Sequence, residues 1–210
     1  MVEGWISWVS SRWREENANR YLSKDIQICY NIGMNHYEIV QCEAMGNHGI
    51  VTFAGAKRLG ISPVELDRWC KRGKLMRVGR GVYRFTSYPS EGMVSDIAAV
   101  LAGIADSYLY GESVLQLLDL CPTRSYVMYI ATPKRIRRKL PAGLEIVRGK
   151  VGYAPVRHEG LLCQRLEDAI LACRGLMDKD RLSEAIDMAE QKGFFMPEEA
   201  LKLKKELEHG

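Results

Sequence analysis

Residues 49–84 constrain the fold of this chain more than any other stretch, because they carry the boundary signals of two short, connected helices. Thr52 is a favourable N-cap residue and predicts a first helix over Phe53–Leu59. Gly60 follows directly, and glycine readily adopts the backbone conformation that a tight turn between helices needs. This order predicts a helix followed by a sharp turn.

A second helix is predicted over Pro63–Arg72. Ser62 is an N-cap residue, Pro63 occupies the first helical position, and Glu65 completes a capping box with Ser62. Gly73 then stands where a helix commonly ends in a left-handed residue. The two helices and their turn predict a helix-turn-helix.

After the second helix, the hydrophobic pattern changes to two short extended runs, Leu75–Val78 and Val82–Phe85. Residues 79–81, Gly-Arg-Gly, lie between these runs and are typical of a hairpin turn. The hairpin would be the wing of a winged helix-turn-helix, with Arg80 at its tip.

Positive charge is concentrated in this module. Residues 49–84 contain nine basic and two acidic residues, a net charge of +7, although the whole chain has a net charge of only +4. Such a concentration is typical of a surface that binds the phosphates of nucleic acid. A solvated basic face on an ordinary small domain is the alternative. The agreement of caps, turn, wing and charge favours binding to double-stranded DNA.

Arg68 is the first candidate for contact with a base. Leu66, Trp69 and Cys70 share an apolar face of the second helix, which leaves Arg68 on its polar side. Arginine can form two hydrogen bonds with guanine in the major groove, whereas the surrounding basic residues are expected to contact phosphates. The predicted DNA-binding residues are Lys57, Ser62, Arg68, Lys71, Arg72, Lys74, Arg77 and Arg80.

Residues Ile50–Arg84, and above all their ending RGKLMRVGRGVYR from Arg72 to Arg84, resemble the N-terminal domain of AbiEi-type antitoxins. These proteins belong to type IV toxin-antitoxin systems, which serve in bacteriophage abortive infection. Residues Tyr108–Leu115 are similar to a short motif that opens the C-terminal domain of that family. The resemblance covers about residues 37–175.

The resemblance implies a non-enzymatic regulator with two activities. The winged domain would repress its own operon by binding inverted repeats in the promoter. The C-terminal domain would oppose a co-encoded toxin that resembles a nucleotidyltransferase, without a need for a stable complex. The chain departs from the family pattern in its N-terminal extension, which leaves the dimer state and the first helix open.

The chain as a whole is predicted to be an α+β protein with three parts. Residues 1–35 are an N-terminal extension, residues 36–87 are the winged helix-turn-helix domain, and residues 88–210 are a mixed α/β C-terminal domain with a helical end. The boundary near Tyr88 is indicated by the turn-forming residues around it.

Hydrophobic period and turn residues predict the other elements. The apolar run 93–105 has almost no polar face and is expected to be a buried helix, and the leucine-rich run 161–173 is expected to be a helix that packs inward. Further helices are predicted over 37–45, 113–120, 180–192 and 197–208, and strands over 126–131 and 144–147.

A second basic patch follows the first of these strands. Residues 134–150 contain seven basic residues and one acidic residue, a net charge of +6. The patch either extends the DNA-binding surface or grips RNA, or it is a solvated loop next to a strand. Residues 159–210 carry a net charge of −4, which suits protein contacts or contact with the basic half of the chain. The candidate residues of the patch are Lys134, Arg135, Arg137, Arg138 and Lys139.

No catalytic, metal or cofactor site is predicted. The spacings of a zinc protease, a nucleophile elbow and a phosphate-binding loop are absent from the sequence. The six cysteines contain no CxxC pair, and no histidine stands at ligand spacing from them. Reduced thiols in a cytoplasmic protein are therefore expected.

Two alternatives to an antitoxin stay open. A transcription regulator with a ligand-sensing C-terminal domain would use Tyr108, Tyr110, Tyr126 and Tyr129 to line a pocket, although core packing explains these residues better. A nuclease guided by the winged module would need clustered carboxylates, for which Glu145, Glu167 and Asp168 are a poor set.

Residues 1–35 hold three of the four tryptophans. Trp5, Trp8 and Trp13 fall at helical spacing together with Val9. A membrane-surface helix is one interpretation, but a helix that docks on the body, or an extension upstream of it, is favoured because acidic residues dilute the basic face. Met34 is a candidate second start of translation. The sequence contains no run of transmembrane length and no signal peptide.

Overall fold

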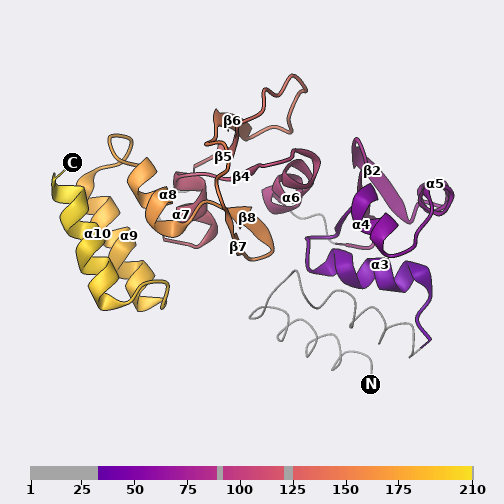
Figure 1. Cartoon of the computed structure of the whole chain (residues 1–210), viewed down its shortest axis with the longest axis horizontal. Helices are drawn as coiled ribbons and strands as arrows, with labels where there is room; N and C mark the ends of the chain where they lie inside the picture. Colours follow the sequence, from indigo (N-terminus) through magenta and orange to yellow (C-terminus); the bar gives the residue numbers. More distant parts are fainter. Residues whose placement is uncertain (1–32, 89–91, 121–124, 210) are drawn as a thin grey trace. The chain divides into compact units, whose positions relative to one another are not determined.

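The computed structural model describes residues 33–88, 92–120 and 125–209, which form two compact units divided between Gly103 and Ile104 (Figure 1). The predicted N-terminal helix around Trp5, Trp8 and Trp13 lies outside the described residues. Each unit combines helices with a sheet, so the α+β fold class is confirmed.

The first unit, called the winged unit below, is a small three-stranded sheet with helices. The sheet has the strand order β1-β3-β2, and all neighbouring strands are antiparallel. The prediction of a winged helix-turn-helix is confirmed, although the sequence did not indicate strand β1. The elements are α3 (His36–Met45), β1 (Ile50–Thr52), α4 (Phe53–Arg58), α5 (Pro63–Lys71), β2 (Leu75–Gly79), β3 (Val82–Phe85) and α6 (Met93–Gly103).

Local signals place the helices of the winged unit. The Thr52 hydroxyl accepts a hydrogen bond of 3.0 Å from the backbone N–H of Gly55, so Thr52 caps α4 as predicted. Gly60 and Gly73 have φ angles of 77° and 70°. These left-handed conformations turn the chain after α4 and after α5, which is the reason for glycine at both positions.

Tyr37 joins the elements of the winged core. Its ring lies 5.3 Å from the ring of Trp69 in an edge-to-face arrangement and 5.4 Å from the ring of Phe85. Helices α3 and α5 and strand β3 therefore share one apolar centre. The buried residues of this core are Ile39, Val40, Ala44, Val51, Ala56, Leu59, Ile61, Leu66, Trp69, Leu75 and Phe85.

Helix α6 packs against β1 and β3 and belongs to the winged unit. This apolar helix was predicted to belong to the second domain, beyond a boundary near Tyr88. Ile97 is fully buried and Val100 is 4% exposed, as expected for a helix with almost no polar face. The helix ends at Gly103, two residues earlier than predicted.

The second unit contains a five-stranded mixed sheet with the order β6-β5-β4-β8-β7. Helices α9 and α10 lie side by side at its C-terminal end (Figure 1). The elements are β4 (Tyr108–Leu109), α7 (Glu112–Leu117), β5 (Met128–Thr132), β6 (Leu144–Arg148), β7 (Val156–His158), β8 (Leu161–Cys163), α8 (Leu166–Ala172), α9 (Lys179–Gln191) and α10 (Pro197–His209).

The prediction of one helix over residues 161–173 is wrong. Residues Leu161–Cys163 form strand β8, which pairs with β7 in an antiparallel hairpin, and α8 begins only at Leu166. Glu159 and Gly160 form the turn with φ angles of 49° and 80°. Positive φ at both central residues is the geometry of a tight hairpin turn, and this turn sets the strand pairing.

Strands β5 and β6 are adjacent and parallel, with Met128 opposite Leu144 and Thr132 opposite Arg148. Strand β5 starts two residues later than the predicted strand 126–131, because Tyr126 is 92% exposed and lies outside the sheet. Residues 133–143 connect the two parallel strands without a helix and project from the sheet as an open loop (Figure 1).

Candidate nucleic-acid interface

The start of α5 is fixed by a complete capping box. The Ser62 hydroxyl accepts a hydrogen bond of 3.2 Å from the N–H of Glu65 and donates one of 3.1 Å to the Glu65 carboxylate. The Ser62 N–H also donates to that carboxylate, and His36 Nδ1 lies 3.1 Å from its other oxygen. These hydrogen bonds, the backbone one foremost, lower the pKa of Glu65 to about 2. Ser62 is thus engaged in the helix cap.

The outward face of α5 carries the charged residues. Leu66 is 1% exposed and Trp69 is 8% exposed, so this side of the helix faces the core. Arg68, Lys71 and Arg72 are exposed, as the amphipathic pattern predicted. Lys71 Nζ lies 2.7 Å from a carboxylate oxygen of Asp67, one turn earlier, and this hydrogen bond raises the pKa of Lys71.

The wing is the hairpin of β2 and β3. Gly81 has a φ angle of 68° at the turn, and the strand register shifts between Arg77 and Gly79. Arg77 and Arg80 are exposed, and Arg77 Nε donates a hydrogen bond of 3.3 Å to the carbonyl of Gly79. Arg80 is at the tip of the hairpin, as predicted from the Gly-Arg-Gly sequence.

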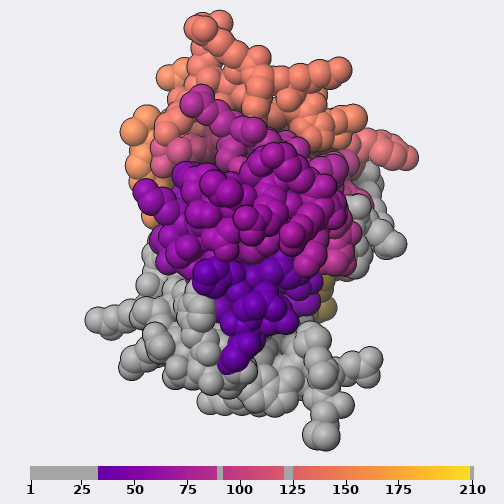
Figure 2. Space-filling model, turned by 90° about the vertical axis from the view of Figure 1, so that its right-hand side faces the viewer, coloured from indigo at the N-terminus to yellow at the C-terminus, as the bar shows by residue number. Residues whose placement is uncertain are grey.

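Lys74 lies between helix α5 and the wing. Its ammonium group lies 4.2 Å from the centre of the Tyr37 ring, which is a cation–π distance. Lys74 remains exposed, so the aromatic ring orients the charge without burying it. Lys57, on the last turn of α4, is exposed as well. Figure 2 shows the atoms of the winged unit in indigo to magenta.

Besides Lys71, which pairs with Asp67, two of the nine basic residues in 49–84 face acidic side chains of the winged unit. Arg58 lies 3.8 Å from Glu43, a carboxyl whose pKa is raised chiefly by burial. Arg84 lies 2.7 Å from Asp96 of α6, with only 12% of its side chain exposed. The other seven basic residues are the ones predicted to bind DNA, and all seven are exposed.

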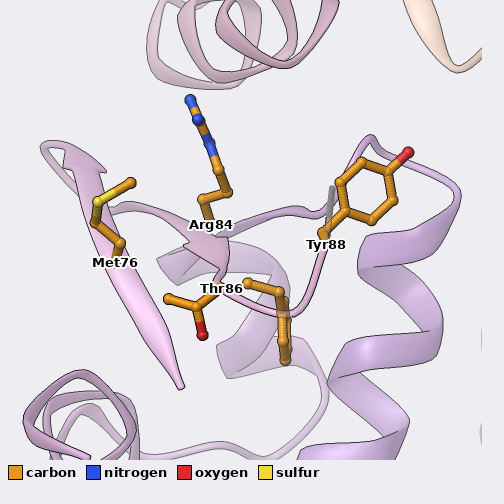
Figure 3. Close-up of a pocket in the computed structure, with 5 residues that line it drawn as sticks. Met76, Arg84, Thr86 and Tyr88 are labelled. Atoms are coloured by element: carbon orange, nitrogen blue, oxygen red, sulfur yellow. The ribbon is translucent and has the colours of Figure 1, made fainter. Parts of the chain in front are cut away.

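Arg84 extends from β3 beside a small hollow of about 170 Å³ (Figure 3). Met76, Phe85, Thr86 and Tyr88 line the hollow with it. Arg84 Nε is buried and has no hydrogen-bond partner, although the Nη2 atom bonds to Asp96. This ion pair was not predicted, because it depends on how α6 packs on the sheet.

The predicted second basic patch lies in the second unit, in the loop between β5 and β6. Lys134, Arg135, Arg137, Arg138 and Lys139 are all exposed. Lys134 lies 3.2 Å from a carboxylate oxygen of Asp106. No ion pair is recorded for the other four among the described residues, so their charge faces solvent.

Two of the tyrosines named for a ligand pocket lie in different surroundings. Tyr126 is 92% exposed, whereas Tyr108 is 2% exposed and stacks on Tyr153 at 4.6 Å between ring centres. Tyr153 donates a hydrogen bond of 2.6 Å to Asp168, which ties this carboxylate, named for the nuclease alternative, to the core. Within the described residues, no three His, Cys, Asp or Glu side chains are grouped as metal ligands.

Among the helices of residues 33–88, 92–120 and 125–209, none is both long and apolar enough to cross a membrane.

The three-stranded sheet, the capped helix-turn-helix and the wing form a winged helix-turn-helix within the winged unit, a fold found among nucleic-acid-binding proteins. Residues 39–86 match the profile of a protein family described as "Transcriptional regulator, AbiEi antitoxin". The match runs from within α3 to the residue after β3, and it confirms the resemblance of this domain to AbiEi antitoxins. No curated protein matches the chain.

Proposed function

We propose that the chain is a DNA-binding autorepressor and the antitoxin of a type IV toxin-antitoxin system. In this proposal the winged unit binds inverted repeats in the promoter of its own operon. The observation that carries the proposal is the set of seven exposed basic residues on the part of the chain that matches the AbiEi family profile. A cytoplasmic location fits this role.

The recognition helix α5 is proposed to enter the major groove, where Arg68 contacts a guanine. Arg68 suits this role because it lies on the exposed face of α5, opposite Leu66. Phosphate contacts are assigned to exposed basic residues outside this face, whereas the N–H and hydroxyl of Ser62 are both bonded to Glu65, so Ser62 acts by fixing the start of the helix. The assigned side chains are Lys57, Arg72, Lys74, Arg77 and Arg80, and Lys71 is proposed to face the DNA beside Arg68 with its charge partly balanced by Asp67.

The basic loop over residues 134–139 is assigned a supplementary phosphate contact. Four of its five basic side chains point to solvent without a recorded acidic partner, which supports contact with a polyanion. A solvated loop would have the same composition, so the loop carries less of the proposal than the winged unit does.

The proposed division places the winged domain at residues 36–87 and an antitoxin part at residues 88–210. The antitoxin part is proposed to oppose a co-encoded toxin. The family description names antitoxins, and the proposal adds that the toxin resembles a nucleotidyltransferase and needs no stable complex with this chain. Co-expression of the neighbouring gene with and without this chain tests this half of the proposal. Growth arrest that this chain does not relieve would contradict it.

Gel-shift binding of the purified chain tests the repressor half. The probes are its own promoter and a scrambled duplex of equal length, at two salt concentrations, with Mg²⁺ present. Selective binding that weakens at higher salt, with the DNA left intact, is the expected result. Equal binding to both duplexes would contradict the repressor, and cleaved DNA would favour the nuclease alternative.

Replacement of Arg68 by alanine is expected to relax sequence preference at one position of the binding site. The loss of two hydrogen bonds to guanine should cost about 1 to 3 kcal/mol of discrimination there. Lys57→Ala is the matched control, because loss of a phosphate contact should weaken binding to all sequences evenly. Selection from a randomised duplex pool measures both profiles. An Arg68→Ala profile identical to that of the native chain would show that another residue reads the base.

A further inference from the structure

Val64 is an exposed apolar residue on the charged face of the recognition helix. It is the second residue of α5, and 67% of it is exposed. The buried residues of α5 are Leu66 and Trp69, so the core has no contact that explains an isopropyl group at position 64. Valine is also a modest helix former, so helix propensity does not explain it either.

The geometry of the helix places Val64 next to Arg68. An α-helix turns about 100° per residue, so residues 64, 68 and 71 fall within about 60° of one another. Val64, Arg68 and Lys71 therefore form one stripe on the side opposite Leu66, and all three are exposed. Because the N-terminal residues of a recognition helix approach the bases most closely, Val64 lies at the leading end of this stripe.

The surroundings of Val64 suit a base edge better than a phosphate. Asp67 lies on the same side of the helix, is 62% exposed at its side chain and holds Lys71 at 2.7 Å. This pair partly neutralises the positive charge beside Val64, and a carboxylate repels phosphate oxygens. An apolar side chain next to a neutralised pair is poorly matched to the DNA backbone.

The floor of the major groove offers one apolar group, the C5-methyl of thymine. We infer that Val64 is a specificity-determining residue that contacts this methyl group in the DNA site of the winged unit. The inference rests on the proposed DNA-binding function and deepens it, since it assigns a second base to the recognition helix. The distance from residue 64 to residue 68 is about 6 Å along the helix axis, and base pairs are spaced about 3.4 Å apart. The thymine is therefore expected one or two base pairs from the guanine that Arg68 contacts.

Substitution of deoxyuridine for thymine tests this assignment, because it removes only the methyl group. Each thymine of the promoter site is replaced in turn, and the affinity of the full chain is measured for the native protein and for Val64→Ala. The native protein is expected to lose about fourfold in affinity at one thymine, the value for one buried methyl group. Val64→Ala is expected to bind the thymine and deoxyuridine duplexes equally at that position.

Arg68→Ala is the matched control, because it should keep the sensitivity to the thymine methyl group. The thermal unfolding midpoint of Val64→Ala should equal that of the native chain, since position 64 lies outside the core. Selective promoter binding with the same response to deoxyuridine in the native chain and in Val64→Ala would overturn the inference and leave the repressor standing. Loss of promoter selectivity in the native chain itself would overturn the repressor, and the inference with it.

Discussion

Removal of three exposed positive charges, two in the wing and one just before it, is expected to weaken DNA binding roughly 100-fold at low salt, because each lost phosphate contact reduces the number of counterions released on binding. The variant is Lys74→Gln/Arg77→Gln/Arg80→Gln. All three side chains are exposed, and none belongs to the apolar core, so the fold should be kept. The slope of log affinity against log salt should become shallower by about 3, and gel-shift titrations at four salt concentrations measure it.

A variant with the same change in net charge serves as the control. Lys179→Gln/Arg181→Gln/Lys202→Gln removes three exposed basic residues from α9 and α10 in the second unit. This control should keep the native salt slope, because its charges are assigned no contact with DNA. Equal losses in the two variants would show that net charge alone, rather than the wing, attracts the DNA.

Replacement of Gly49 by alanine is expected to destabilise the winged unit by roughly 3 kcal/mol. Gly49 has a φ angle of 74°, which residues with a Cβ atom adopt only at a cost in conformational energy. The new Cβ would also lie 2.4 Å from Cγ of Tyr88 and 2.6 Å from its Cβ, too close for either group to remain in place. Hydrogen-exchange mass spectrometry of peptides within residues 37–88 measures the loss within the winged unit alone.

Gly60→Ala separates the two causes. Gly60 has nearly the same φ angle, 77°, but a Cβ there would meet nothing within 4 Å. The strain of a positive φ angle should cost about 1 kcal/mol on its own, so Gly60→Ala should have the smaller effect. If the two variants lose equal protection from hydrogen exchange, the contact between position 49 and Tyr88 does not cause the destabilisation by Gly49→Ala.

The winged unit could be predicted from the sequence because its signals are local. The capping box of Ser62 and Glu65 and the turn at Gly60 each act within four residues, and the structure shows both. The sequence did not distinguish Arg84 from the exposed basic residues, because its pairing with Asp96 depends on the packing of α6 on the sheet. Val64 was not predicted as a site residue, because its exposed fraction is a property of the folded helix.

The second unit was harder to predict, because its sheet is assembled from distant and very short strands. Strand β4 has two residues, too few to show an alternating pattern, and β8 was absorbed into the predicted helix because its residues are all apolar. The turn at Glu159 and Gly160 separates β8 from β7, but Glu-Gly is a weaker hairpin signal than Asn-Gly or Asp-Gly. The two C-terminal helices, with clear amphipathic periods, were predicted to within about one residue.

The pairing of β4 with β8 also affects the order in which the chain folds on the ribosome. Leu109 of β4 pairs with Ile130 of β5 on one side and with Cys163 of β8 on the other, so the second side of this central strand stays unpaired until about 54 further residues are synthesised. At about 5 to 20 residues per second, this delay lasts roughly 3 to 10 seconds. The winged unit needs only partners that precede Ile104, so it can fold first. A nascent chain would therefore carry a folded helix α5 while its second sheet still lacks strand β8, the second partner of β4.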